Sequence, residues 1–219
     1  MRLSSLMGVV LLLWGCSKVN NSTTKIFGHA ATGLQNPNAI YHDNSLDAIR
    51  YASSLTRCSG VEVDVRMDAQ GQLWLFHDEL LDDETNLSGS VEEMTTDELT
   101  SGHYGTLKKE PLLKLDAATT AELSQGYTFL DLKIPEMSKA QEIKSALLAL
   151  DCDTTKFALI VSSLSYVDVF KYDFQVFLSI NEITELTSEM LENESGLRGI
   201  CIRSAQITRE EINFLKSIH

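Results

Sequence analysis

Alternation of short apolar strands with helical segments is the feature that most constrains the fold of this chain. Apolar runs typical of strands occur at 25–28, 61–65, 73–77, 128–133, 157–161, 175–179 and 199–202. Segments with helical spacing of apolar residues occur at 46–52, 95–99, 138–150, 165–172, 183–193 and 208–217. Repeated strand–helix units predict an α/β fold whose parallel strands are joined by right-handed crossovers.

Polar residues at the strand ends distinguish between the two folds that contain such a sheet. A dinucleotide-binding fold would carry a glycine-rich G-x-G-x-x-G turn after its first strand, but Gly28 is followed by His29, Ala30 and Ala31. Charged or imidazole groups instead end the first four strands, where a barrel builds its active site. We therefore predict a TIM-type (β/α) barrel over 25–219, with an acidic insertion at about 78–115. Because only seven strands are counted, we expect the barrel to lack its eighth strand–helix unit.

The first 15 residues are expected to be a signal peptide. Arg2 precedes an apolar run at 3–13, which is too short to span a bilayer. The run ends in Leu13-Trp14-Gly15-Cys16, which resembles the lipobox of bacterial lipoproteins; a plain cleaved signal is the alternative. We expect lipidation of Cys16, with residues 16–24 as the lipidated cysteine and a polar tether. This predicts a lipid-anchored protein of the bacterial cell envelope, at its periplasmic or outer-membrane face, with the membrane as a partner.

The charge and cysteine content narrow the function classes. With 31 acidic and 18 basic side chains the formal charge is −13, which argues against a nucleic-acid partner. An anionic small molecule remains a compatible substrate because one bound cation can reverse the local field. The cysteines are too few for a disulfide scaffold. After removal of the signal, Cys58, Cys152 and Cys201 are expected to be buried thiols and not a metal site.

Carboxylates at the ends of two strands suggest a cation site. Glu62 and Asp64 are two residues apart on one strand, so both side chains point to the same face. Such a pair is favourable when a cation lies between the carboxylates, and oxygen ligands suit Mg²⁺ or Ca²⁺. Asp131 can add a third carboxylate, and Lys133 can hold a phosphate oxygen. The alternatives are a solvated acidic edge strand and a strand with surface ion pairs.

Histidines lie at the ends of two other predicted strands. His29 follows the first strand and His77 ends the third. Neutral imidazoles exchange protons near pH 7, so the two are candidates for an acid–base pair, although a single histidine is more often structural. His42, His103 and His219 have no such context and are left unassigned.

The order of these motifs, from about 26 to 135, resembles the glycerophosphodiester phosphodiesterase family, with this chain as a divergent bacterial lipoprotein member. The matching segments are Gly28-His29, Asp43-Asn44-Ser45-Leu46, Gly60-Val61-Glu62-Val63-Asp64-Val65, Asp68-Ala69-Gln70-Gly71, His77-Asp78 and Leu130-Asp131-Leu132-Lys133. The resemblance implies a TIM-type barrel that hydrolyses glycerophosphodiesters to glycerol 3-phosphate and an alcohol. It implies acid–base roles for His29 and His77, a divalent metal ion, Mg²⁺ or Ca²⁺, on Glu62, Asp64 and Asp131, and a place near the phosphate for Lys133.

Two positions depart from the family pattern. Ala30 stands where the family has an arginine, and Asp131 stands where it has a glutamate. Loss of a bidentate arginine contact affects phosphate affinity or substrate choice. The shorter Asp131 requires a shifted metal or a bridging water. The alternative functions are a catalytically impaired barrel lipoprotein that binds a phosphodiester or other ligand without turnover, and a phosphodiesterase acting on inositol or sphingoid head groups.

Overall fold

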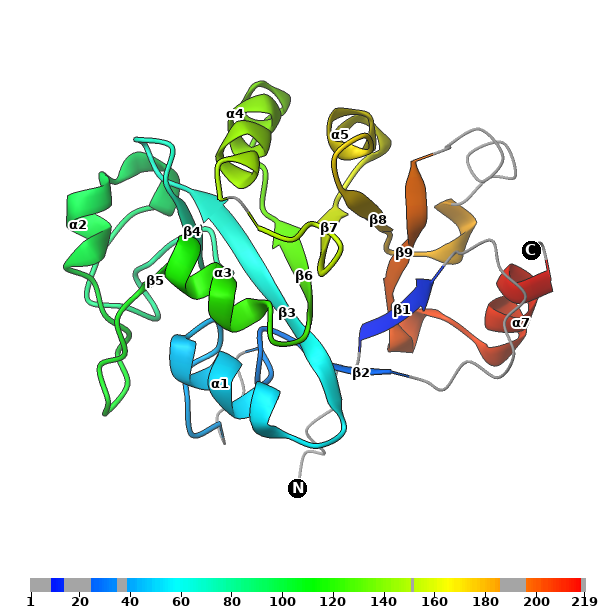
Figure 1. Cartoon of the computed structure of the whole chain (residues 1–219), viewed down its shortest axis with the longest axis horizontal. Coiled ribbons are helices and arrows are strands. Elements are labelled where there is room, and N and C mark those ends of the chain that lie inside the picture. Colours follow the sequence, from blue (N-terminus) through cyan, green and yellow to red (C-terminus); the bar gives the residue numbers. More distant parts are fainter. Residues whose placement is uncertain (1–8, 14–24, 35–38, 151, 186–195, 218–219) are drawn as a thin grey trace.

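The computed structural model of the chain describes residues 9–13, 25–34, 39–150, 152–185 and 196–217 (Figure 1). The strands are β1 Val9–Leu13, β2 Ile26–Gly28, β3 Cys58–Met67, β4 Leu73–Leu75, β5 Leu113–Lys114, β6 Tyr127–Leu132, β7 Phe157–Val161, β8 Gln175–Ser179 and β9 Leu197–Arg203. The helices are α1 Leu46–Ser54, α2 Thr96–Thr100, α3 Ala117–Leu123, α4 Met137–Leu148, α5 Leu164–Phe170 and α7 Arg209–Ser217, with 3₁₀ turns at Val91–Glu93, Ile183–Glu185 and Ser204–Gln206.

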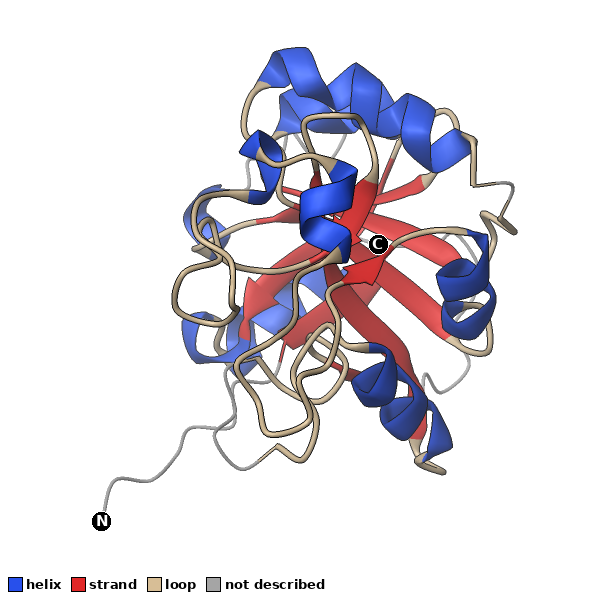
Figure 2. Ribbon diagram, turned by 90° about the vertical axis from the view of Figure 1, so that its left-hand side faces the viewer, coloured by secondary structure: helices blue, strands red, loops and turns tan. Residues whose placement is uncertain are grey.

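One curved sheet organises the molecule. Strands β2, β3, β6, β7, β8 and β9 are paired in this order and are parallel. The helices lie around the outside of the strands (Figure 2). Alternate strand residues point to opposite faces: Val63 and Leu159 belong to the core beneath the helices, whereas Phe129 and Phe177 form a separate aromatic cluster. The rings of these two phenylalanines meet edge-to-face, with centroids 5.2 Å apart. The predicted α/β fold with a mainly parallel sheet is confirmed.

The apolar run at 73–77 predicted a barrel strand, and this prediction is wrong. Strand β4 is antiparallel to both β3 and β5. The reason is a tight turn in which Asp68 Oδ1 accepts hydrogen bonds from the backbone N–H groups of Gln70 and Gln72, at 2.8 and 2.9 Å. Gly71 has a φ of +86°, which favours glycine. The chain therefore doubles back along β3, and the expected count of seven barrel strands is wrong by this one.

Among the described residues, β1 is the edge strand at the far end of the sheet. It pairs with β9 in antiparallel register, from Val9 opposite Arg203 to Leu13 opposite Gly199. In the part of the chain that the structure describes, β2 pairs only with β3. Strand β1 lies inside the expected signal segment, whose cleavage stays a prediction. Cys16 and the expected tether fall outside the described residues.

The insertion and the segment of β4 share a small separate core. The buried side chains of this core are Trp74, Phe76, Leu81, Val91, Leu99, Tyr104 and Leu112. Within the insertion, Thr95 caps α2 by accepting a hydrogen bond from the Glu98 backbone N–H, and the Glu98 side chain accepts one in return. The insertion is thus a packed lobe beside β3 and not an irregular loop.

The expected helices at 46–52, 95–99, 138–150, 165–172 and 208–217 are present as α1, α2, α4, α5 and α7. Helix α3 was not expected because its sequence lacks an apolar period; Asp116 starts it by accepting from the Thr119 backbone N–H at 3.0 Å. Of the expected helix 183–193 only a turn at Ile183–Glu185 is described. No helix among the described residues is long and apolar enough to cross a membrane. Cys58, Cys152 and Cys201 are half-buried thiols, not fully buried ones.

Candidate functional site

Two adjacent parallel strands bring three carboxylates together. Glu62 and Asp64 lie on β3 and are only 4% and 1% exposed, and Asp131 on β6 is directly opposite Asp64 in the register. One carboxylate oxygen from each of the three lies within 4.8 Å of the others. Strand β3 is paired on both sides, and the side chains of Glu62 and Asp64 are buried. These two facts exclude the alternative of a solvated acidic edge strand.

Lys133 contacts two of these three carboxylates. Its Nζ lies 2.9 Å from Asp64 Oδ1 and 2.7 Å from Asp131 Oδ2. Burial lowers the pKa of Lys133, but the two carboxylates outweigh this and raise it above its usual value. The ammonium group is therefore firmly charged and bridges the two strand ends.

The carboxylates carry more negative charge than one lysine balances. Burial raises the pKa of Glu62 well above its ordinary value, and the negative charges of Asp64 and Asp131 add to the effect. Burial also raises the pKa of Asp131, although Lys133 opposes it. Among the described residues, the buried Glu62 Oε1 has no hydrogen-bond partner. Buried carboxylates with an unpaired oxygen fit a hard divalent cation.

His29 is fixed beside Glu62 by the turn after β2. A Cβ atom at Gly28 would lie 1.8 Å from the carbonyl oxygen of Ala31, so only glycine allows this turn. The backbone N–H of Ala30 donates to Glu62 Oε2 at 2.8 Å, and that of Ala31 donates to the Glu62 carbonyl at 3.0 Å. His29 Nε2 then lies 3.7 Å from Glu62 Oε2. Burial is the largest influence on the pKa of His29 and lowers it, so the imidazole is neutral at pH 7.

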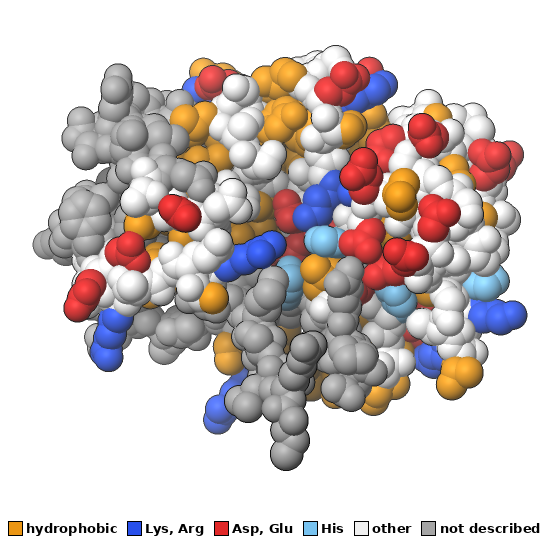
Figure 3. Space-filling model, turned by 180° about the vertical axis from the view of Figure 1, so that it is seen from behind, with side chains coloured by type: hydrophobic (Ala, Val, Ile, Leu, Met, Phe, Trp, Pro, Cys, Tyr) orange, Lys and Arg blue, Asp and Glu red, His pale blue; other side chains and the backbone are white. Residues whose placement is uncertain are grey.

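His77 reaches the same site from the antiparallel hairpin. The backbone N–H of Phe76 donates to the Asp64 carbonyl at 3.1 Å, and the Arg66 guanidinium donates to the His77 carbonyl at 3.0 and 3.2 Å. His77 Nδ1 lies 2.6 Å from a carboxylate oxygen of Asp78. Figure 3 shows histidine and acidic side chains beside lysine or arginine side chains in a hollow on one face of the molecule. All six predicted site residues thus converge at one end of the sheet.

Asn44 is a site residue that the sequence reading missed. Its Nδ2 donates to Asp64 Oδ2 at 2.8 Å and its Oδ1 accepts from the Asp64 backbone N–H at 3.0 Å. The side chain is fully buried and its φ is +54°. In the sequence, Asp43-Asn44-Ser45-Leu46 matched the family pattern but gave Asn44 no role; the neighbouring Ser45 caps α1 by accepting from the Ala48 backbone N–H at 3.2 Å. Asparagine tolerates a left-handed backbone better than most residues do. An asparagine directly before a helix-capping serine is therefore the signal that could have indicated a special role for Asn44.

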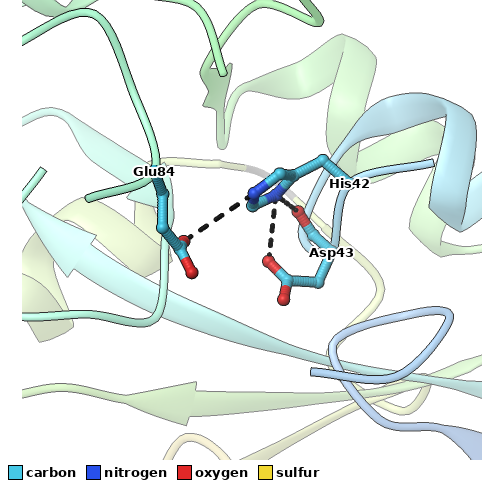
Figure 4. Close-up of side chains that lie close together, drawn as sticks. All are labelled: His42, Asp43 and Glu84. Atoms are coloured by element: carbon cyan, nitrogen blue, oxygen red, sulfur yellow. Dashed lines mark hydrogen bonds and ion pairs between the residues drawn. The ribbon is translucent and has the colours of Figure 1, made fainter. Parts of the chain in front are cut away.

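A second cluster involves His42, which the sequence left unassigned. His42 Nδ1 lies 3.1 Å from Asp43 Oδ1, and Nε2 lies 3.8 Å from Glu84 Oε2 (Figure 4). The imidazole stacks on Tyr104, with ring centroids 3.6 Å apart. Burial raises the pKa of Glu84 to about 7, and Asp43 and Asp78 contribute in the same direction. The cluster connects the insertion to the loop that carries Asn44.

A parallel sheet whose strand ends gather oxygen ligands and imidazoles has the groups that phosphoester hydrolysis needs. The family model of the glycerophosphoryl diester phosphodiesterase family matches residues 29–175, and the chain belongs to this family. A glycerophosphodiester phosphodiesterase of Bacillus altitudinis is 35% identical over 79 residues, which are 36% of this chain and 30% of that protein. The match therefore spans less than a third of that relative's length.

Solved structures share the fold. The phosphodiesterase OLEI02445 of Oleispira antarctica, in complex with the product sn-glycerol-3-phosphate, has a TM-score of 0.74 at 20% identity, covering 89% of this chain and 81% of that one. A putative glycerophosphodiester phosphodiesterase from Galdieria sulphuraria has a TM-score of 0.71 at 14% identity, covering 89% and 80%. At these identities the likeness concerns the fold. It supports the TIM-type barrel as the architecture to which the parallel strands belong.

Proposed function

We propose that this protein hydrolyses glycerophosphodiesters to glycerol 3-phosphate and an alcohol. Family membership supports the reaction class. The observation that carries the proposal is the convergence of three carboxylates, Lys133 and two histidines at one end of the sheet.

Glu62, Asp64 and Asp131 are the residues that would hold a divalent cation, Mg²⁺ or Ca²⁺. Such an ion, when bound, would neutralise negative charge on the phosphodiester. The unpaired Glu62 Oε1 and the raised pKa values of Glu62 and Asp131 support a cation at this place. Lys133 lies next to these carboxylates, so its ammonium group is positioned to pair with a phosphate oxygen as well.

The proposal gives the two histidines opposite proton-transfer roles. His29, kept neutral by burial, takes the proton from the attacking oxygen of water or of the neighbouring glycerol hydroxyl. As that oxygen bonds to phosphorus, the bond from phosphorus to the alcohol oxygen breaks. When the glycerol hydroxyl attacks, the product is a cyclic phosphate, and water then adds to phosphorus and opens the ring to give glycerol 3-phosphate. His77 donates the proton that the leaving oxygen needs, and the contact of its Nδ1 with Asp78 Oδ1 orients the imidazole.

The test is hydrolysis of glycerophosphocholine by the purified protein with added Mg²⁺ or Ca²⁺. We expect His29→Gln and His77→Gln each to reduce kcat by roughly 10²–10⁴-fold. His103→Gln is the matched control because His103 lies in the insertion and its Nδ1 contacts the Tyr104 carbonyl. Full rate in either active-site variant would show that the acid–base assignment is wrong.

Ligand binding without turnover is the second candidate function. Ala30 is fully buried with a φ of +45°, so no cationic side chain occupies the place where the family has an arginine. This alternative is favoured if glycerol 3-phosphate binds, measured by calorimetry, while no head group of a glycerophosphodiester panel is released.

The anchoring of the protein is also a proposal. The lipobox-like sequence ending at Cys16 supports attachment to the cell envelope. We expect the wild-type chain expressed in bacteria to fractionate with membranes and to incorporate labelled fatty acid, and Cys16→Ser to lose both. Equal labelling of the two chains would contradict the anchor.

A further inference from the structure

We propose that His42 and Glu84 are the ligands of a second metal site, for a transition-metal ion of the Zn²⁺ type, and that Asp43 orients the imidazole. This site is separate from the carboxylates on β3 and β6 and does not depend on the proposed hydrolytic function. His42 and Asp43 belong to the loop before α1, whereas Glu84 belongs to the insertion (Figure 4).

The hydrogen bonds of the imidazole leave one nitrogen available. His42 Nδ1 lies 3.0 Å from the Asp43 carbonyl and 3.1 Å from Asp43 Oδ1, and both of these oxygens can only accept. Nδ1 therefore carries the proton, and in the neutral ring the lone pair is on Nε2. Histidines that bind metals almost always donate their other N–H to a carboxylate or a carbonyl in this way.

The free lone pair faces a carboxylate across a gap of suitable width. Nε2 and Glu84 Oε2 are 3.8 Å apart, which is too long for a hydrogen bond. An ion at about 2.0–2.2 Å from each atom would span this separation at an angle of about 120–145°, and a gap of about 3.4 Å would give the tetrahedral angle. One ligand atom each from His42, Asp43 and Glu84 lie within 4.8 Å of one another, so Asp43 is also within reach of the ion.

The surroundings of Glu84 favour a positive charge there. Burial, together with the negative charges of Asp43 and Asp78, opposes ionisation of this carboxyl, and the nearby His42 and His77 oppose the effect only in part. A divalent cation would stabilise the carboxylate and relieve the repulsion among the acidic groups.

The imidazole is held rigidly, as a metal ligand requires. One face of the ring stacks on the fully buried Tyr104, and the backbone N–H of His42 donates to Glu110 Oε1 at 3.0 Å. Glu110 is itself fixed by the hydroxyl of Thr106, which donates to Oε2 at 2.8 Å. An imidazole ligand selects transition metals, whereas the all-oxygen set on β3 and β6 suits Mg²⁺ or Ca²⁺.

A metal ion at this place would join the insertion to the loop that supports the hydrolytic site. Two residues beyond His42, Asn44 makes both of its side-chain hydrogen bonds to Asp64. Cross-linking Glu84 to His42 would therefore brace the insertion and stabilise the folded chain.

The test uses the full chain without a histidine tag, in a Glu62→Gln/Asp64→Asn background that removes the all-oxygen site. Zn²⁺ is titrated by calorimetry and its effect on the melting temperature is recorded. Although burial lowers the pKa of His42, its hydrogen bonds to Asp43 raise it overall. The titration is therefore done at about pH 8, because only a neutral imidazole binds a metal.

We expect the background protein to bind Zn²⁺ and to melt at a higher temperature when it does. Adding His42→Gln or Glu84→Gln should weaken binding by at least about tenfold and remove the increase in melting temperature, and Asp43→Asn should weaken it by about 10–100-fold. His103→Gln is the control and should bind as the background does. The proposal is overturned if the background takes up no Zn²⁺, or if His42→Gln binds it as tightly. Activity does not enter these measurements, so a failure of the hydrolytic proposal would remain distinguishable.

Discussion

Replacing Lys133 by methionine should destabilise the metal-free protein strongly and the metal-loaded protein only weakly. The Lys133 ammonium contacts Asp64 at 2.9 Å and Asp131 at 2.7 Å, and Asp64 is only 1% exposed. Methionine keeps most of the volume of the side chain but leaves Glu62, Asp64 and Asp131 without this positive charge.

The magnitude follows from the burial of the partners. Removing one partner of a buried ion pair costs about 3–5 kcal/mol, because the remaining charge is uncompensated. Lys133 is 23% exposed, so we expect a loss near the lower limit, about 3 kcal/mol. A divalent cation at roughly 100 times its Kd adds about 2.7 kcal/mol to the free energy of unfolding. Because the cation takes over the role of the ammonium group, it should bind the Lys133→Met variant more tightly than the wild type.

The assay is urea unfolding at one fixed pH of about 8, with EDTA or with Mg²⁺ or Ca²⁺. We expect the difference between wild type and Lys133→Met to shrink from about 3 to about 1 kcal/mol when the cation is present. Lys139→Met is the control, since Lys139 forms an exposed pair with Glu142, and exposed pairs contribute about 0–1 kcal/mol. The same loss with and without the cation would refute the reasoning that a metal ion and Lys133 stabilise the same carboxylates.

Three further changes test other parts of the site. Asn44→Ala should lower the free energy of unfolding by about 2–4 kcal/mol in urea, because Asp64 loses a charge-assisted bond and its backbone N–H loses its acceptor; a loss below about 1 kcal/mol would contradict this. Arg66→Met should lower kcat by about tenfold with a smaller change in KM, because the guanidinium holds the carbonyl of His77; unchanged kcat would contradict the positioning role. The pKa of Glu84 is raised from its ordinary value of 4.5 to about 7 in the folded chain. The free energy of unfolding of the metal-free protein should therefore fall as the pH rises from 4.5 to about 7. Urea unfolding at several pH values should show that Glu84→Gln removes about 1–2 kcal/mol of this fall. If the wild type and the variant lose the same free energy of unfolding over this pH range, Glu84 is not the source of the fall.

The sequence was sufficient for the parts of the protein that depend on local pattern. The period-two alternation at 61–65 places Glu62 and Asp64 on one face, and the apolar spacing at 46–52 and 138–150 predicts helices that are present. These features depend on neighbours along the chain, so they can be read from it. The same holds for His29 and Lys133, which directly follow strands.

Long-range contacts could not be read in this way. Only the register between β3 and β6 places Asp131 opposite Asp64, and only the fold brings Asn44 to Asp64 across 20 positions of sequence. The apolar run 73–77 has the composition of a barrel strand, but the turn at Asp68 makes it antiparallel.

The sequence by itself thus determined the fold class and most of the chemical groups at the strand ends, because periodicity and residue type are local properties. The tertiary structure alone decided which carboxylates are buried, which cation they contact and what His42 faces. Burial, charge balance and pairing across strands depend on residues that are distant in the sequence, and these contacts shift the pKa values of the buried groups.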